Sequence, residues 1–133
     1  MSVFGLTLLP DQGQAPEGFV AASVALGEHE EATLMSTKRW SKNDYLQHWM
    51  EAAKAALKGE QPTLFCDDFE LESCSCFVGW RVGQEFIFEQ WIFRMEDVRA
   101  DGRLLRLRGE ADMSRDVSQW RVPVAAIRSF ANS

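Results

Sequence analysis

The sequence lacks any long apolar run. No window approaches the roughly 18 consecutive apolar residues that a membrane-spanning helix requires, and the first ten residues carry no basic start. We therefore expect a cytoplasmic protein with no membrane partner. Its 133 residues are 46% hydrophobic and 26% charged, which is the composition of an ordinary globular protein. This length predicts one domain, residues 1–133, that folds without disulfide or metal staples.

Cysteine is scarce, and its number is odd. The chain has Cys66, Cys74 and Cys76, and the last two lie too close in sequence to pair comfortably. These features favour reduced thiols. A Cys-Ser-Cys spacing could begin a thiolate metal site, but no second pair follows and only His29 and His48 could complete it. We expect neither metal nor cofactor, with Cys74 and Cys76 packing on one strand face as small hydrophobic residues.

Catalytic motifs are also missing. The sequence contains no Gly-rich phosphate loop, zinc motif or nucleophile elbow. Asp44 and His48 lie four residues apart and could share a proton, but no nucleophile is placed beside them, so we expect a surface pair. Glu85 and Glu89 would lie about 13 Å apart on one strand face, too far for a typical glycosidase pair. The sequence predicts no enzyme.

Positive charge is absent where negative charge concentrates. The net charge is −6, and residues 1–72 hold 12 acidic and 5 basic side chains. No basic residue lies between Lys58 and Arg81, a gap that contains five acidic residues, namely Glu60, Asp67, Asp68, Glu70 and Glu72. Because phosphate binding needs clustered Lys and Arg, this balance argues against direct binding of nucleic acid. The gap fits either a solvated loop or a patch that attracts a basic protein.

A helix over about 41–58 is the best-marked element. Ser41 is a good N-cap, Asp44 completes a capping box and Gly59 follows as a stop. Trp40 before the cap and Tyr45 at the fourth helical position have the spacing of a hydrophobic staple. The apolar stripe contains Tyr45, Trp49, Ala52, Ala53 and Ala56, and we expect it to face the core.

The remaining pattern predicts short strands. We expect a linker-like start at 11–17, with the core domain beginning near Gly18. The predicted segments are strands at 19–26 and 33–35 around a charged turn at 27–31, a strand at 63–66, an acidic loop at 67–72, a hairpin of 74–82 with 85–95, strands at 104–107 and 119–122, and a helix at 123–131. Apolar residues on both sides of 85–95 suggest a central strand covered on both faces. The fold class is α+β, mostly an antiparallel sheet with both helices packed on it.

The run Trp40-Ser-Lys-Asn-Asp44-Tyr45-Leu-Gln-His-Trp49 resembles a spaced-aromatic pattern in one family of CdiI immunity proteins, which belong to bacterial contact-dependent growth inhibition systems. The acidic segment 27–31, the aromatic hairpin 77–93 and Ser118-Gln-Trp120 before the last helix are similar too. The resemblance implies that Trp40, Asp44, Tyr45, Trp49 and Trp120 are the pattern's structural residues. It also implies a protein that binds the C-terminal toxin domain of a cognate CdiA effector and occludes it. For the oligomeric state, which the sequence leaves open, we favour a monomer.

Many such toxins are nucleases with basic substrate-binding surfaces, so acidic residues here could mimic phosphate. The candidate toxin-binding residues are Asp67, Asp68, Glu70, Glu72, Glu85 and Glu89. An alternative is a sheet-based module for nucleic acid or a small ligand, with a stacking platform of Phe77, Trp80, Phe86, Phe88 and Trp91. Its only basic cluster would be Arg103, Arg106 and Arg108. A third alternative is an adaptor or inhibitor of another system.

Overall fold

The computed structural model describes residues 3–10, 15–109 and 118–133. Within them, β1 (Val3–Leu8), β2 (Phe19–Gly27) and β3 (His29–Ser36) form a first sheet in the order β1-β2-β3. A second sheet has the order β4-β5-β6-β9, from β4 (Thr63–Phe69), β5 (Ser73–Val82), β6 (Glu85–Arg94) and β9 (Trp120–Pro123). The hairpin of β7 (Val98–Asp101) and β8 (Leu104–Leu107) follows a short 3₁₀ turn at Met95–Asp97. All pairings are antiparallel.

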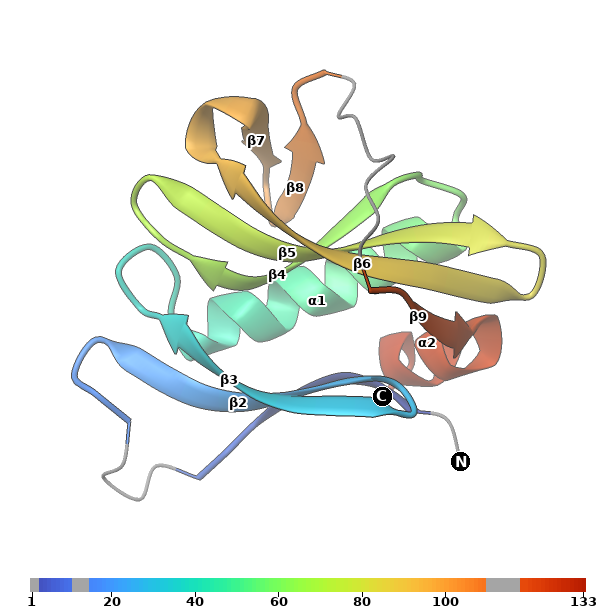
Figure 1. Cartoon of the computed structure of the whole chain (residues 1–133), viewed down its shortest axis with the longest axis horizontal. Coiled ribbons are helices and arrows are strands. Elements are labelled where there is room, and N and C mark those ends of the chain that lie inside the picture. The colour runs from blue at the N-terminus through green and yellow to red at the C-terminus, as the bar shows by residue number, and fades with distance from the viewer. Residues whose placement is uncertain (1–2, 11–14, 110–117) are drawn as a thin grey trace.

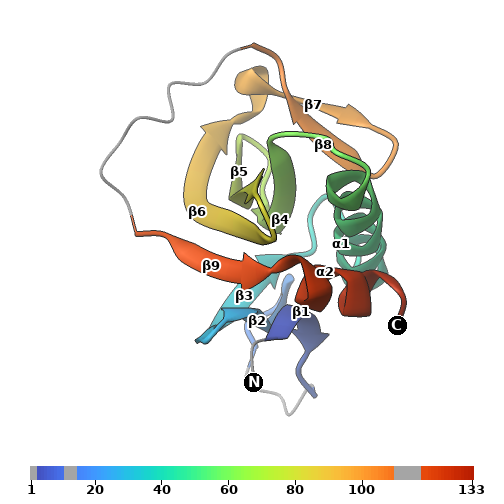
Figure 2. The ribbon, with the colours of Figure 1, turned by 90° about the vertical axis from the view of Figure 1, so that its right-hand side faces the viewer.

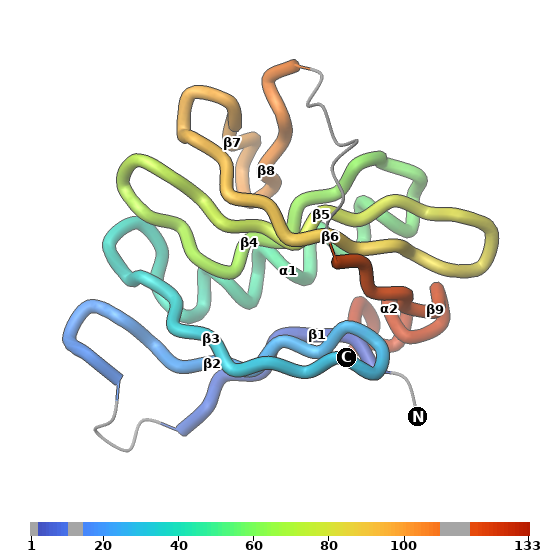
Figure 3. Tube along the Cα trace, viewed as in Figure 1, coloured from blue at the N-terminus to red at the C-terminus, as the bar shows by residue number. Residues whose placement is uncertain are grey.

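The two helices, α1 (Lys42–Leu57) and α2 (Val124–Ala131), lie side by side against the sheets. Figure 1 shows the first sheet below the second, with α1 behind the space between them and the β7–β8 hairpin above. In Figure 2 the second sheet curls strongly, and β9 runs toward the first sheet before the chain enters α2. The trace in Figure 3 follows the same path. This arrangement confirms the expected α+β fold of mostly antiparallel strands with two packed helices.

Helix α1 begins and ends as its caps predict. Ser41 accepts a hydrogen bond from the Asp44 N–H at 3.2 Å, and Asp44 accepts one from the Ser41 N–H at 2.9 Å. Trp40 packs edge-on against Tyr45 with ring centroids 5.4 Å apart, as a hydrophobic staple requires. Tyr45 and Trp49 are completely buried. The apolar stripe of α1 therefore faces the core, as expected.

The core begins before Gly18, contrary to the sequence prediction. Strand β1 carries buried Phe4, whose ring centroid lies 5.5 Å from that of Trp49 and 5.4 Å from that of Phe130 in α2. Gly5 permits this packing, because a Cβ there would lie 2.9 Å from Cδ1 of Phe130. The contact joins distant parts of the chain, so local periodicity could not indicate it.

Two predicted loops are strands in the structure. The predicted charged turn at 27–31 is only the tight turn between β2 and β3, and His29 already pairs with Leu26. Strand β4 extends through Asp67 and Asp68 to Phe69, with a register shift between Cys66 and Asp68. A bulge of this kind accommodates one extra residue and re-aims its side chain. The acidic loop is therefore confined to residues 70–72.

Each face of β6 is covered over only part of the strand. Phe86 and Phe88 are completely buried on one face in the first part, and Phe93 is buried on the other face near the end. Ile92, on the same face as Phe88, is 77% exposed. Strand β6 is central in its sheet, between β5 and β9, but the predicted covering of both faces does not extend over the whole strand. Among the described residues, neither helix has the length and apolarity that crossing a membrane demands.

Candidate binding surface

Three side chains of α1 bind the outer edge of β4 and fix its position. The Cys66 N–H donates to Nε2 of His48 at 2.9 Å, while Nε1–H of Trp49 donates to the Cys66 carbonyl at 2.8 Å. Tyr45 donates its hydroxyl proton to the Ser36 carbonyl at 2.6 Å and accepts the Phe69 N–H at 2.9 Å. These side chains occupy the place of a neighbouring strand and satisfy the outward backbone groups of Cys66 and the N–H of Phe69.

His48 is buried in the α1–β4 contact and is not the surface partner of Asp44 that its spacing predicted. Burial lowers the pKa of His48 to about 4, so its ring is neutral at pH 7. Nε2 accepts the hydrogen bond from the Cys66 N–H, hence Nδ1 carries the ring proton and donates to the Arg103 carbonyl. Asp44 instead pairs with Nη1 of Arg103 at 2.8 Å. Hydrogen bonding to Ser41 and the charge of Arg103 lower the pKa of Asp44.

Asp67 lies at the β4 bulge and points away from α1. It is only 4% exposed; its Oδ2 accepts a hydrogen bond from Nε2 of Gln90 at 3.1 Å, and its buried Oδ1 has no partner among the described residues. Burial is the main cause that raises the pKa of Asp67 to about 7, and the negative charges of Asp68 and Glu31 add to it. A carboxyl group held this way is costly for folding.

Three other acidic residues of the gap follow Asp67 in the chain, whereas Glu60 lies elsewhere and pairs with Arg106. Asp68 is half-buried and accepts the Ser36 N–H at 2.9 Å, and burial raises its pKa. Glu70 lies 3.5 Å from Nζ of Lys38, and Glu72 is exposed in the turn before β5. Together with Glu31 of β3, whose side chain is 35% exposed, these groups form the acidic surface, defined as Glu31, Asp67, Asp68, Glu70 and Glu72.

Strand β3 contributes His29 and Glu31, which were not among the predicted toxin-binding residues. The His29 ring stacks on Trp120 with centroids 4.6 Å apart and an interplanar angle of 21°. Trp120 also packs edge-on against Phe77 at 5.9 Å. His29 and Glu31 were read as a turn, although their alternation with exposed residues is a strand signal. The contact brings β3 and β9 together beside the acidic surface.

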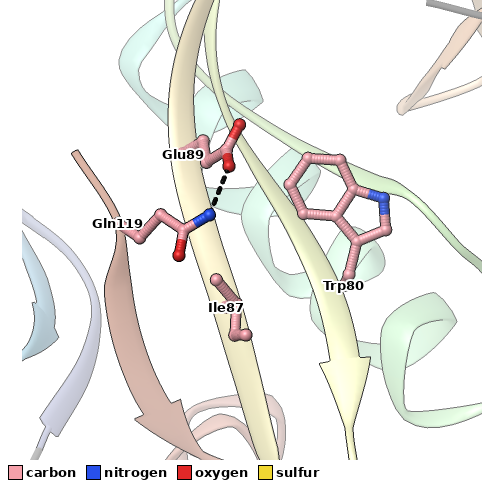
Figure 4. A pocket seen from close by; sticks show the side chains of 4 residues that line it. All are labelled: Trp80, Ile87, Glu89 and Gln119. Carbon is pink, nitrogen blue, oxygen red and sulfur yellow. Dashed lines mark hydrogen bonds between the residues drawn. The ribbon is translucent and has the colours of Figure 1, made fainter. Parts of the chain in front are cut away.

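Glu85 and Glu89 lie apart from the acidic surface. Glu89 is only 4% exposed and lines a pocket with Trp80, Ile87 and Gln119 (Figure 4). Its carboxylate accepts hydrogen bonds from Nε2 of Gln119 at 2.7 Å and from Nε1 of Trp91 at 3.0 Å. Glu85 lies 3.4 Å from Nη1 of Arg121 near the hairpin turn. The six predicted acidic residues thus occupy at least two separate places.

The cysteines pack together in the core. All three are completely buried, and Sγ of Cys74 lies 3.8 Å from Sγ of Cys76. Burial raises the pKa of the Cys66 and Cys76 thiols. Over residues 3–10, 15–109 and 118–133, no group of three or more His, Cys, Asp or Glu side chains is arranged to hold a metal ion.

Three of the five residues of the predicted stacking platform are not available for bases. Phe77, Phe86 and Phe88 are completely buried, whereas Trp80 and Trp91 are half-buried. The basic cluster is also engaged. Arg103 pairs with Asp44, Arg106 pairs with both Glu60 and Asp101, and Nε–H of Arg108 donates to the Val98 carbonyl at 3.2 Å. These contacts argue against the nucleic-acid alternative.

Comparisons with known proteins identify one informative likeness. No protein-family model matches this chain, and none of the curated proteins does. Among solved structures, the chain is similar to one in the "CdiA-CT/CdiI toxin and immunity complex from Enterobacter cloacae", with a TM-score of 0.78 and 13% sequence identity. The alignment covers 98% of this chain and 97% of that chain. At this identity the likeness establishes a shared fold.

Proposed function

We propose that this protein is an immunity protein that binds and neutralises the toxin domain of a cognate CdiA effector. The observation that carries the proposal is the fold, which matches a chain of a toxin and immunity complex over 98% of the present chain. The spacing of Trp40, Asp44, Tyr45 and Trp49 supports the same assignment independently, because all four are used structurally in one region. Asp44 forms part of the N-terminal cap of α1, and the three aromatic residues, in this helix or just before it, are buried.

The proposed action is stoichiometric occlusion in the cytoplasm of the toxin-producing cell. An inhibitor of this kind needs a rigid surface and no chemistry of its own. The contacts of α1 with β4 provide rigidity, and the acidic surface provides charge that complements a basic toxin. A nuclease is a suitable target, because its substrate-binding surface must attract phosphate groups.

The acidic surface is the part of the molecule that we propose for the first encounter. Asp68 and Glu70 affect each other's electrostatic environment, and Glu31 adds charge from another sheet. Since Asp67 is buried, the attraction at a distance must come mainly from Glu31, Glu70 and Glu72. Glu85 and Glu89 are candidates for contact only if the interface extends along β6.

Co-expression with the toxin domain encoded beside this gene tests the proposal. Cells that produce the toxin domain alone should stop growing, and cells that also produce this protein should grow normally. In vitro, the toxin's activity should disappear near one equivalent of inhibitor, and the two chains should elute together. Growth arrest caused by this protein alone would assign it to the toxin side of the complex. Neutralisation at far below one equivalent would indicate an enzyme.

A further inference from the structure

Beyond its pairing with β9, one edge of β6 has no backbone partner among the described residues, and its position can be located residue by residue. The Cys66 N–H and carbonyl both bind side chains of α1, so Cys66 and its β5 partner Cys76 form a non-hydrogen-bonded pair. Adjacent pairs alternate in an antiparallel ladder, so Cys76 must direct its N–H and carbonyl toward Trp91 on β6. The odd-numbered residues of β6 therefore bind β5, and the even-numbered ones point away from it.

Strand β9 uses only part of this outward edge. It pairs with β6 from Glu85 to Phe88, and Pro123, which has no N–H to donate, stands opposite Glu85 where none is needed. The next outward-pointing residues are Gln90 and Ile92. Among the residues that the structure describes, no backbone group pairs with their N–H or carbonyl groups.

This open edge carries an exposed apolar side chain at its centre. Ile92 is 77% exposed, more than any other large hydrophobic residue described. It lies opposite Ser75 on the same sheet face as Gln90, whose side chain donates to both Asp67 and Ser75. Proteins usually protect a free edge with charge, proline or a covering element. Positions 90–92 carry neither a charged residue nor a proline, and no described strand or helix pairs with this stretch beyond β9. The opposite edge of the same sheet, β4, is covered by α1.

We propose that the β6 edge at Gln90–Ile92 receives an extended strand from the toxin domain, which adds to the second sheet next to β9. The proposal rests on the immunity function proposed above. The incoming strand would exchange backbone hydrogen bonds with Gln90 and Ile92 and place an apolar side chain against Ile92. Basic residues in or beside it would be favoured by the net charge of −6 and by the neighbouring acidic surface.

A second copy of this chain is the competing occupant. Two copies would bring two charges of −6 together and pair one acidic neighbourhood with another. A basic, extended segment of another protein satisfies the same backbone groups without this repulsion. The charge therefore favours the toxin strand over self-association.

Amide hydrogen exchange, followed by NMR on the full chain alone and with the purified toxin domain, tests the inference. In the free protein the Trp91 and Phe93 amides should already be protected by β5, whereas those of Gln90 and Ile92 should exchange quickly. In the complex the Gln90 and Ile92 amides should slow by at least about tenfold, the effect expected of a newly formed hydrogen bond. A complex with unchanged exchange at both positions would overturn this inference and leave the immunity function standing.

Two other outcomes would also overturn it. If the toxin domain does not bind at all, the immunity function fails and this inference fails with it. If both amides are already protected in the free protein and the protein elutes at twice its mass, the edge belongs to a second copy.

A backbone-directed variant provides a second test. Ile92→Pro removes the outward N–H while leaving the β5 ladder intact, whereas Ile92→Ala removes the side chain and keeps the N–H. Thermal melting should show both variants folded. Toxin binding should weaken by about tenfold more for Ile92→Pro than for Ile92→Ala. Val82→Ala, at another exposed apolar position beside the hairpin turn, should bind like the wild type. Equal affinity of the Ile92→Pro and Ile92→Ala variants would contradict strand addition.

Discussion

The two sides of β4 differ in whether their buried polar side chains have hydrogen-bond partners. On the side facing α1, the polar atoms of Tyr45, His48 and Trp49 all have hydrogen-bond partners, although these residues are completely buried. On the other side Asp67 is almost as deeply buried, and its Oδ1 has none among the described residues. The first side contributes stability, whereas the second reduces it. A buried group that lowers stability is often explained by a role in binding. We therefore assign the α1 side of β4 to holding the fold and the Asp67 side to the candidate binding surface.

The largest expected loss of stability comes from truncating Trp49, on the side of β4 that faces α1. Trp49→Ala should cost about 3–5 kcal/mol, because it leaves a large cavity and deprives the Cys66 carbonyl of its donor. Chemical denaturation measures the loss. Trp80→Ala, the same change at a half-buried pocket position, is the matched control and should cost clearly less. A loss below about 1 kcal/mol at Trp49 would show that this side does not hold the fold.

Removing the Tyr45 hydroxyl tests the hydrogen bonds of this side separately from its packing. Tyr45→Phe keeps the ring and its packing, but it leaves the Ser36 carbonyl and the Phe69 N–H without their partner. Two unsatisfied buried groups should cost about 2–3 kcal/mol in the free energy of unfolding. The measurement is urea denaturation at pH 7, with Phe65→Leu as a packing control that removes no hydrogen bond. An unchanged midpoint for Tyr45→Phe would mean that water replaces the hydroxyl.

Asp67→Asn should increase the free energy of unfolding, whereas the two previous substitutions decrease it. The pKa of Asp67 is about 7 in the folded protein and near 4 in the unfolded chain, so folding takes up a proton between these values. Stability from this group is complete below about pH 4 and is lost as the pH rises toward 7. Relative to wild type, the variant should therefore gain about 1–3 kcal/mol at pH 8 and little at pH 4. Chemical denaturation of both proteins at pH 4 and pH 8 measures this difference. The buried His48 titrates in both proteins, so it cancels from the difference.

The smallest effect on folding, and a clear one on binding, is expected at Glu70, which is half-buried, and at Glu72, which is exposed. Charge reversal belongs at these two residues and not at Asp67, because a lysine at the bulge would be buried. Glu70→Lys with Glu72→Lys should slow toxin association at low salt and change stability by less than about 0.5 kcal/mol. Stopped-flow association at low and high salt is the measurement. Glu17→Lys with Glu51→Lys is the control of equal net charge, and equal slowing by both pairs would show that position is irrelevant.

The sequence predicted those parts whose signals are local. The caps and stripe of α1, from Ser41 to Gly59, lie within one segment, and the β5–β6 hairpin is marked by its turn at Gly83 and by apolar runs on both sides. Strand β1 was missed because Phe4 is paired with Phe130, far along the chain.

The candidate site was predicted only in part for the same reason. Asp67 and Asp68 look like a loop, since buried carboxylates are rare, and the bulge that seats them depends on contacts with Ser36 and Gln90. The burial of Glu89 depends on Gln119, thirty residues later. A pattern of acids along the chain therefore found the right neighbourhood, but it could not separate buried acids from exposed ones.

The covering of β4 by α1 also determines how many molecules can assemble through the second sheet. A sheet with two open edges can join copies end to end without limit, because each added strand exposes another edge. Here side chains of α1, among them His48 and Trp49, occupy the β4 edge, so each copy of this sheet can add a strand only at β6. A row of copies joined edge to edge would need both edges of every sheet, and each copy offers one. The helix therefore prevents open-ended assembly of this chain through its second sheet.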